Sequence, residues 1–262
     1  MKKPLLDVLF ASDKRKNLLL FLKDETKEME EILSHLRTNR QSLLPQVRIL
    51  EEHHIVTHES DIYELTIMGR QIVEKMVPLI STVNVLNTSI DYWGTRNLDF
   101  IPPHLLKRIN ELGKCITRQP SLVEMHSIQA NFHEASKNSE SVFVVTTFLF
   151  PNHVQLFKEL LENGVNIHFI ISPDVLGRLR YEVNPEFEKL LQNDLLNLFV
   201  HTGDDMNFLS FGLNDKCLFL RLFTNTGEND SRFTACTSSS ALKWGKELFE
   251  NFRENSTLIT EL

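Results

Sequence analysis

Residues 55–69 have the sequence IVTHESDIYELTIMG, which contains two short strand-like segments and the start of a helix. Residues 55–58 and 62–65 are rich in β-branched and aromatic side chains, and Glu59-Ser60-Asp61 between them are turn formers. This pattern predicts a compact β-hairpin. Thr66 directly follows the second strand and is a good N-cap, so a new helix is expected from Ile67 onward.

Three short amphipathic helices are expected before the hairpin. Apolar residues at 5–10 and 18–22 flank a capping pair at 12–13, and the stripe from Met29 to Leu36 has helical spacing. The polar residues 38–42 then open a helix whose inner face is Leu43, Val47 and Leu50. Helices followed by a β-ribbon are the order of a winged helix-turn-helix domain.

Pro45 lies inside this third helix and removes one backbone donor. A helix start near Leu43 or Leu44 would place the proline in the first turn, where it is tolerated. We therefore expect the preceding polar residues to form a turn.

The junction Leu65-Thr66-Ile67-Met68-Gly69 resembles the strand, Leu-Thr-x-x-Gly, helix junction of many winged-helix regulators, and residues 43–51 resemble their recognition helix. The resemblance implies that the helix enters the major groove of double-stranded DNA. The candidates for base or phosphate contacts are then Thr38, Asn39, Arg40, Gln41 and Ser42, and the candidates for phosphate or wing contacts are Arg37, Arg48 and His58. The alternative for each is an ordinary solvated polar residue.

The net charge of −7 argues against a protein that coats nucleic acid over its whole surface. Residues 1–75 contain 12 Lys and Arg against 13 Asp and Glu, whereas the remainder contains 16 against 22. A nearly neutral small domain still binds DNA where its basic residues share one face, because affinity depends on local phosphate contacts.

The three cysteines, Cys115, Cys217 and Cys236, are far apart and odd in number, so neither a disulfide framework nor a zinc site is expected. The histidines at 53, 54 and 58 lack thiolates or carboxylates at ligand spacing, so no metal is expected. The sequence shows no signal segment and no apolar run of about 18 residues. These observations predict a soluble, cytoplasmic protein.

A long helix is expected after the hairpin, bent at Pro78. Its apolar stripe is Ile72, Met76, Leu79, Val83, Leu86 and Ile90. The stripe packs either on its own domains or against a second copy, and we favour a homodimer because helix-turn-helix proteins usually read two half-sites. Residues 97–103 are non-helical in pattern and mark a boundary. We divide the chain into residues 1–75, 76–100 and 101–262.

The last part alternates strands and helices. Two helical segments are expected, at 105–112 and from the capping box Ser121–Glu124, followed by a strand at 142–148, a helix at 154–161 and a strand at 165–171. This βαβ unit implies a parallel strand pair. Further strands are expected near 196–200, 208–213, 217–223 and 232–235, and a last helix from about Ser238–Ser240. The predicted fold is an α+β winged helix-turn-helix domain followed by an α/β domain with a mixed sheet.

Residues 241–253, ALKWGKELFENFR, are similar to the closing helix of an archaeal regulator family that joins a winged helix to the methanogenesis regulatory protein middle domain. Residues 215–220 and Ser136-Lys137 are also similar to that family. The resemblance covers nearly the whole chain. It implies an archaeal origin, a role in transcription regulation and a phospholipase D-like fold.

Phospholipase D chemistry uses a His-x-Lys-x4-Asp sequence, in which the histidine is the nucleophile and the lysine holds the phosphoryl group. Phe169 and Ile170 follow His168 here, and Thr202 and Gly203 follow His201, so the sequence motif is absent. We therefore expect no enzyme and no cofactor. A phosphodiesterase-like enzyme and a winged helix used for protein contact are the alternatives.

A ligand site is expected at the carboxyl ends of the parallel strands, where open α/β sheets bind small molecules. Thr146, Thr147 and Ser172 lie there, with Arg178 nearby. Arg221 lies in an apolar strand and is either an edge-strand surface residue or a ligand anchor. The chain is thus interpreted as a DNA-binding transcriptional regulator that responds to a small-molecule effector.

Overall fold

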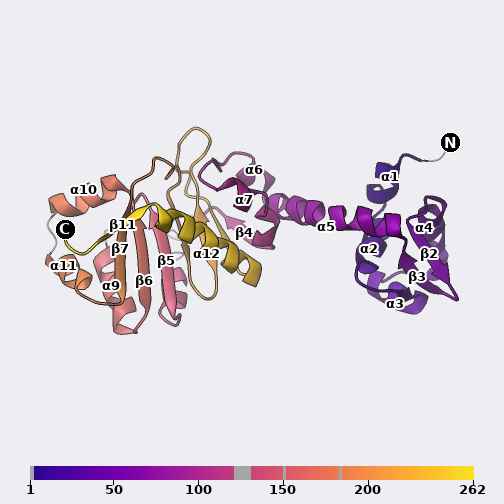
Figure 1. The fold of residues 1–262 in the computed structure, drawn as a ribbon, viewed down its shortest axis with the longest axis horizontal. Coiled ribbons are helices and arrows are strands. Elements are labelled where there is room, and N and C mark those ends of the chain that lie inside the picture. The colour runs from indigo at the N-terminus through magenta and orange to yellow at the C-terminus, as the bar shows by residue number, and fades with distance from the viewer. Residues whose placement is uncertain (1–2, 121–130, 150–151, 183–184) are drawn as a thin grey trace. The chain divides into compact units, whose positions relative to one another are not determined.

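The structure is a computed structural model that describes residues 3–120, 131–149, 152–182 and 185–262 (Figure 1). The chain divides into two compact units, Met1–Ile80 and Ser81–Leu262. Within the described ranges, each helix is too short or too polar to cross a membrane. Residues 121–130, where a capping box was predicted, lie outside the described residues.

The first unit combines helices with a small antiparallel sheet of order β1-β3-β2. Its elements are α1 (Leu5–Phe10), α2 (Asp13–Phe21), β1 (Lys27–Glu28), α3 (Met29–Leu36), α4 (Arg40–Glu52), β2 (Val56–Glu59), β3 (Ile62–Leu65) and the first part of α5 (Ile67–Asn87). The predicted hairpin is confirmed, with Glu59 opposite Ile62 and positive φ angles at Ser60 and Asp61 in the turn. Leu18, Ile32, Leu43 and Leu50 are among the fully buried residues of its core.

Helix α4 begins at Arg40, so the expectation that Pro45 delays the start to Leu43 or Leu44 is wrong. The Asn39 side chain accepts a hydrogen bond from the Ser42 amide at 2.9 Å, and this cap sets the start of the helix. Pro45 is exposed and faces away from the core, where a lost backbone hydrogen bond is least costly.

The long helix α5 ends at Asn87, and Ile90 lies in the separate short helix α6 (Ile90–Trp93). The prediction of one helix through Ile90 is therefore wrong at its end. The Thr88 side chain donates to the Val85 carbonyl at 2.6 Å. This hydroxyl contact occurs at the point where the helical hydrogen-bonding pattern stops.

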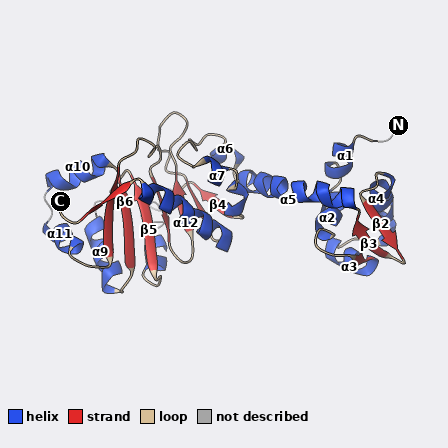
Figure 2. Ribbon diagram, in the orientation of Figure 1, coloured by secondary structure: helices blue, strands red, loops and turns tan. Residues whose placement is uncertain are grey.

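The second unit is built on one large sheet, whose strands are drawn in red in Figure 2. It is a mixed sheet of order β11-β7-β6-β5-β8-β9-β10-β4, in which β5, β6 and β7 are parallel. This confirms the predicted mixed sheet and its βαβ unit. Its strands are β4 (Cys115–Arg118), β5 (Ser141–Thr146), β6 (Asn166–Ile171), β7 (Leu196–His201), β8 (Ser210–Leu213), β9 (Leu218–Arg221), β10 (Phe233–Cys236) and β11 (Ser256–Ile259). Its helices after α6 include α7 (Pro103–Leu106), the 3-10 helix η1 (Ile109–Leu112), α9 (His153–Glu162), α10 (Pro173–Glu182), α11 (Pro185–Leu191) and α12 (Ser239–Glu254).

Helices cover both faces of this sheet. Val142 and Phe169 pack with Phe157 of α9 and Phe187 of α11 on one face. Val145 and Ile170 belong to the other core, which contains α12. Successive residues of a strand point to opposite faces, so β5 and β6 contribute to both cores and place α9 and α12 on opposite sides.

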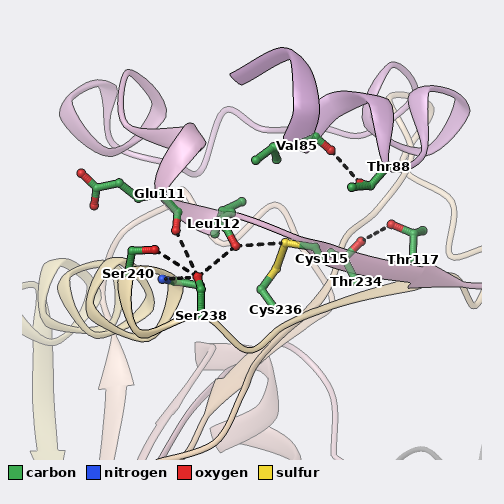
Figure 3. Close-up of a disulfide and its surroundings, with 11 residues drawn as sticks. Val85, Thr88, Glu111, Leu112, Cys115, Thr117, Thr234, Cys236, Ser238 and Ser240 are labelled. Carbon is green, nitrogen blue, oxygen red and sulfur yellow. Dashed lines mark hydrogen bonds between the residues drawn. A yellow bond between two sulfur atoms is a disulfide. The ribbon is translucent and has the colours of Figure 1, made fainter. Parts of the chain in front are cut away.

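Cys115 and Cys236 form a disulfide, and the expectation that the cysteines stay unpaired is wrong (Figure 3). The two residues lie directly opposite each other in the antiparallel pair β4–β10, with their Cα atoms 4.3 Å apart. Two residues along, the Thr117 and Thr234 hydroxyls are 2.9 Å apart. The sequence pattern predicted no strand at β4, so it did not indicate that residues 115 and 236 are paired.

The Leu-Thr-x-x-Gly junction has a clear structural cause. The Thr66 hydroxyl oxygen accepts from the Gly69 amide at 3.0 Å and caps α5. A Cβ built at Gly69 would overlap the carbonyl oxygen of Ile55. The first turn of α5 therefore lies directly on the chain that enters β2, and only glycine fits there without moving the backbone.

Substitution Gly69→Ala is expected to lower the free energy of unfolding by about 2 kcal/mol or more, although alanine favours helices, because the backbone must shift. The matched control is Gly177→Ala in α10, where an added Cβ meets no described atom within 4 Å apart from its chain neighbours and the backbone of its own helix. The control should raise stability by up to about 1 kcal/mol. Urea unfolding, followed by circular dichroism, measures the free energy of unfolding of both variants. Equal changes in the two variants would contradict the close contact at Gly69.

Candidate nucleic-acid interface and ligand cavity

Helix α4 has a buried face and an exposed face. Leu43, Val47 and Leu50 are buried in the core of the first unit. Gln41, Pro45, Arg48 and Glu52 are exposed, at spacings that align them along the opposite side. The side chains available to an external partner along α4 are therefore Gln41 and Arg48, with one proline and one carboxylate beside them.

Three of the predicted DNA-contacting residues hold the start of α4. Besides capping the Ser42 amide, Asn39 accepts the Ser42 hydroxyl on its carbonyl oxygen at 3.1 Å. The Thr38 and Ser42 hydroxyl oxygens are 2.9 Å apart. Asn39 is exposed, whereas Thr38 and Ser42 are half-buried in this capping cluster.

The cationic candidates differ in their surroundings. Arg40 forms an ion pair with Asp61 in the hairpin turn, which connects the start of α4 to that turn. His58 Nδ1 lies 2.5 Å from Glu51 Oε1, and its ring stacks on Tyr63 with centroids 5.0 Å apart.

Arg37 and Arg48 are exposed, and Arg37 closes α3 in the left-handed conformation, with φ 47°. The hairpin turn is acidic, since Asp61 lies in it and Glu59 directly precedes it. The exposed arginines therefore lie at the α3–α4 turn and along α4, whereas the tip of the hairpin carries negative charge.

Arg15 is a residue whose role the sequence pattern did not predict. It is only 4% exposed, and its guanidinium donates to the carbonyls of Val8 at 2.6 Å and Asp7 at 3.0 Å. A third bond, of 2.6 Å, reaches the side-chain oxygen of Gln46 in α4. Arg15 thus ties α1 and α4 to α2. In the sequence it stands between two lysines, and nothing distinguishes it from a solvated residue.

Substitution Arg15→Met is expected to lower the free energy of unfolding by about 2 kcal/mol or more, because buried carbonyls lose charged donors. Arg48→Met, on the exposed side of α4, is the control and should change stability by less than about 0.5 kcal/mol. Urea denaturation of the two variants tests this. Equal losses, or no loss at Arg15, would show that its hydrogen bonds do not support the unit.

The second unit brings two of the five predicted ligand residues to one cavity of about 140 Å³. Thr146 at the end of β5 and Arg221 at the end of β9 both line it. Strand β9 lies between β8 and β10, so Arg221 is not on an edge strand. Burial lowers the pKa of its guanidinium. Arg221 thus contributes a cation to a largely apolar wall.

The other three residues serve local structure. The Thr147 hydroxyl donates to the Phe208 carbonyl at 3.0 Å. Ser172 is buried, and its hydroxyl oxygen accepts from the Val175 amide at 3.4 Å in the first turn of α10. Arg178 is exposed and pairs with Glu182 at 2.7 Å. The strand-end rule selected all of these positions, but only Thr146 turns toward the cavity.

The histidines that the enzyme hypothesis requires are packed as structural residues. His168 stacks on Phe143 with ring centroids 4.7 Å apart, and burial lowers its pKa. His201 is 1% exposed, and its Nε2 lies 2.6 Å from Asp205. Among the described residues, no three His, Cys, Asp or Glu side chains are grouped so as to hold a metal ion.

Three solved structures resemble the chain distantly. TrmBL2, described as an archaeal chromatin protein with a novel mode of DNA binding, has a TM-score of 0.44 at 12% identity, covering 97% of each chain. NucT from Helicobacter pylori has a TM-score of 0.41 at 13% identity, covering 56% of this chain and 100% of NucT. Nuc from Salmonella typhimurium, a phospholipase D family member, has a TM-score of 0.40 at 10% identity, covering 56% of this chain and 99% of Nuc.

One protein related in sequence and two family models match this chain. The methanogenesis regulatory protein FilR1 of Methanothrix harundinacea (strain 6Ac) is 24% identical over 265 residues, which cover 97% of this chain and 58% of that protein. The chain thus spans less than two thirds of the length of this relative. Residues 3–84 match the family "Methanogenesis regulatory protein FilR1, N-terminal domain", and residues 125–255, half of the chain, match "Methanogenesis regulatory protein FilR1, middle domain". The resemblance seen in residues 241–253 is therefore confirmed, and the chain belongs to the FilR1 family of methanogenesis regulatory proteins.

Proposed function

We propose that the chain is a transcriptional regulator that binds double-stranded DNA through its first unit, used as a winged helix. Helix α4 enters the major groove, and the β2–β3 hairpin is the wing. The observation that carries the proposal is the exposed side of α4, where Gln41 and Arg48 are presented on a helix fixed by Arg15. The regulatory description of the family supports it and favours a non-enzymatic role.

Each exposed side chain has a distinct part in this proposal. The amide of Gln41, in the first turn of α4, makes paired hydrogen bonds to adenine. Arg37 and Arg48 bind phosphates and set the register of the helix on the duplex. Arg40 is paired with Asp61 in the wing, so it contributes to DNA binding indirectly, by holding the wing in place.

We also propose the division into a DNA-binding domain of residues 1–75, a connecting segment of residues 76–100 and a regulatory domain of residues 101–262. In the connecting segment, Leu79 is 53% exposed and Val83 is 48% exposed, one turn apart on α5. A second copy covers this apolar surface in the proposal, because a homodimer presents two α4 helices to successive half-sites.

DNA binding is tested with fragments from upstream of the protein's own gene, by fluorescence anisotropy across a range of salt concentrations. Arg48→Ala should weaken binding to all fragments and reduce the slope of log K against log salt by about 1. Gln41→Ala should weaken the preferred fragment more than an unrelated one, by about 1–3 kcal/mol. Arg178→Ala in the second unit is the control and should leave binding unchanged.

No salt-sensitive binding to any upstream fragment would contradict DNA binding. The acidic residues Glu52 at the end of α4 and Glu59 and Asp61 in the hairpin would then favour the second candidate function, a winged helix that contacts another protein.

The dimer is tested by sedimentation of the full chain. Leu79→Glu should convert a dimer into a monomer, because a buried carboxylate without a partner is strongly unfavourable. Tyr181→Glu, at a side chain 89% exposed on α10, is the control and should leave the dimer intact. A monomeric wild-type chain, or a dimer that tolerates Leu79→Glu, would contradict the proposed interface.

A further inference from the structure

The cavity of the second unit has polar groups at one end. Thr146 lies directly opposite Ser210 in the β5–β8 pair, and Ser210 lies directly opposite Arg221 in the β8–β9 pair. Opposite residues in antiparallel strands point to the same face, so the three side chains form a row across the sheet. All three line the cavity, together with Ser231.

Among the described residues, the rest of the lining is mostly apolar, and its polar members are His133, Ser136 and His153. Val144, Phe169 and Phe219 form the floor on the sheet, and Phe157 of α9 and Phe233 of β10 form part of the sides. Gly212 lies opposite Val144 and adds no side chain to the floor. A Cβ at Gly212 would lie 3.2 Å from Phe132 Cζ, so a larger residue there would narrow the space.

The loop before β10 is fixed in place by ion pairs. Asp230 binds the buried side chain of Arg96, with its oxygen 2.5 Å from Arg96 Nη2, and also pairs with Arg232 at 2.6 Å. Between these two residues, Ser231 adopts a positive φ of 66°. The loop therefore presents Ser231 to the cavity from a backbone that is anchored on both sides.

Arg221 supplies the positive charge at this end of the cavity. Burial lowers the pKa of the Arg221 guanidinium, because the charged form is less well solvated there. Arginine matches a carboxylate with two parallel hydrogen bonds, which are stronger than bonds between neutral groups. Serine hydroxyls beside it supply further donors.

We propose that this cavity binds a small monocarboxylate with an apolar body, its carboxylate on Arg221, Ser210 and Ser231 and its body between Val144, Phe157 and Phe219. The volume is close to that of an engineered apolar cavity of roughly 150 Å³ that accepts benzene, so the body has about six carbons. The role of such a carboxylate as an effector of transcription rests on the proposed function. Binding of the carboxylate to the cavity does not depend on the proposed function.

The test is isothermal titration calorimetry of the full chain with benzoate and hexanoate, each compared with its neutral amide. The carboxylates should bind at least about 10-fold more tightly than benzamide and hexanamide. Arg221→Gln should reduce benzoate binding to the level of benzamide and leave benzamide unchanged. Arg221→Lys, which keeps the charge but not the paired geometry, should retain part of the preference.

Two further variants locate the site. Val144→Phe should abolish binding of both benzoate and benzamide by filling the floor. Arg178→Gln removes an exposed arginine of the same unit and should change nothing. Circular dichroism melting shows that each variant is folded. If Arg221→Gln fails to fold, the preference for benzoate over benzamide is compared between the wild type and Arg221→Lys, and a reduced preference in Arg221→Lys supports the proposal.

The proposal is overturned if the wild-type chain binds neither carboxylate, if it binds benzamide as tightly as benzoate, or if the folded Arg221 variants keep the full preference. DNA binding is measured separately, so the two proposals fail independently. A chain that binds benzoate through Arg221 but binds no DNA would contradict the proposed function alone.

Discussion

The contact between the start of α5 and the carbonyl group of Ile55 organises the first unit. Ile55 donates its amide to the Leu50 carbonyl at the end of α4, and its own carbonyl accepts from the Thr66 amide at 3.0 Å. The Thr66 hydroxyl reaches the carbonyl of His54 at 2.7 Å. Helix α4, the hairpin and α5 are thus connected through backbone groups, and Gly69 makes the close approach possible.

In the proposed function, this constraint lets a nearly neutral domain present α4 to DNA. The side chains of α4 that face outward do not contribute to its own core, and the helix is held by caps, by Arg15 and by the hairpin. The second unit uses strand register in a comparable way. Register places Arg221 and the two hydroxyls of Thr146 and Ser210 in one row, although Thr146 is distant in sequence from the other two.

Local patterns predicted the features that depend on neighbouring residues. The hairpin, the cap at Thr66 and the βαβ unit follow from turn chemistry and apolar periodicity, and the structure confirms them. Features that depend on distant pairing were missed. The Cys115–Cys236 disulfide spans 121 residues and requires strand β4, a four-residue edge strand with a weak sequence signal. Ser210 was missed because its role is set by the strands beside it.

Amide hydrogen exchange of the full chain, with and without a bound upstream DNA fragment, tests the central claim most directly. The account predicts that DNA slows exchange in the α3–α4 turn and along α4, around residues 37–48, and leaves the strands of the large sheet unchanged. Slowed exchange confined to residues 141–236, with residues 37–48 unaffected, would contradict it.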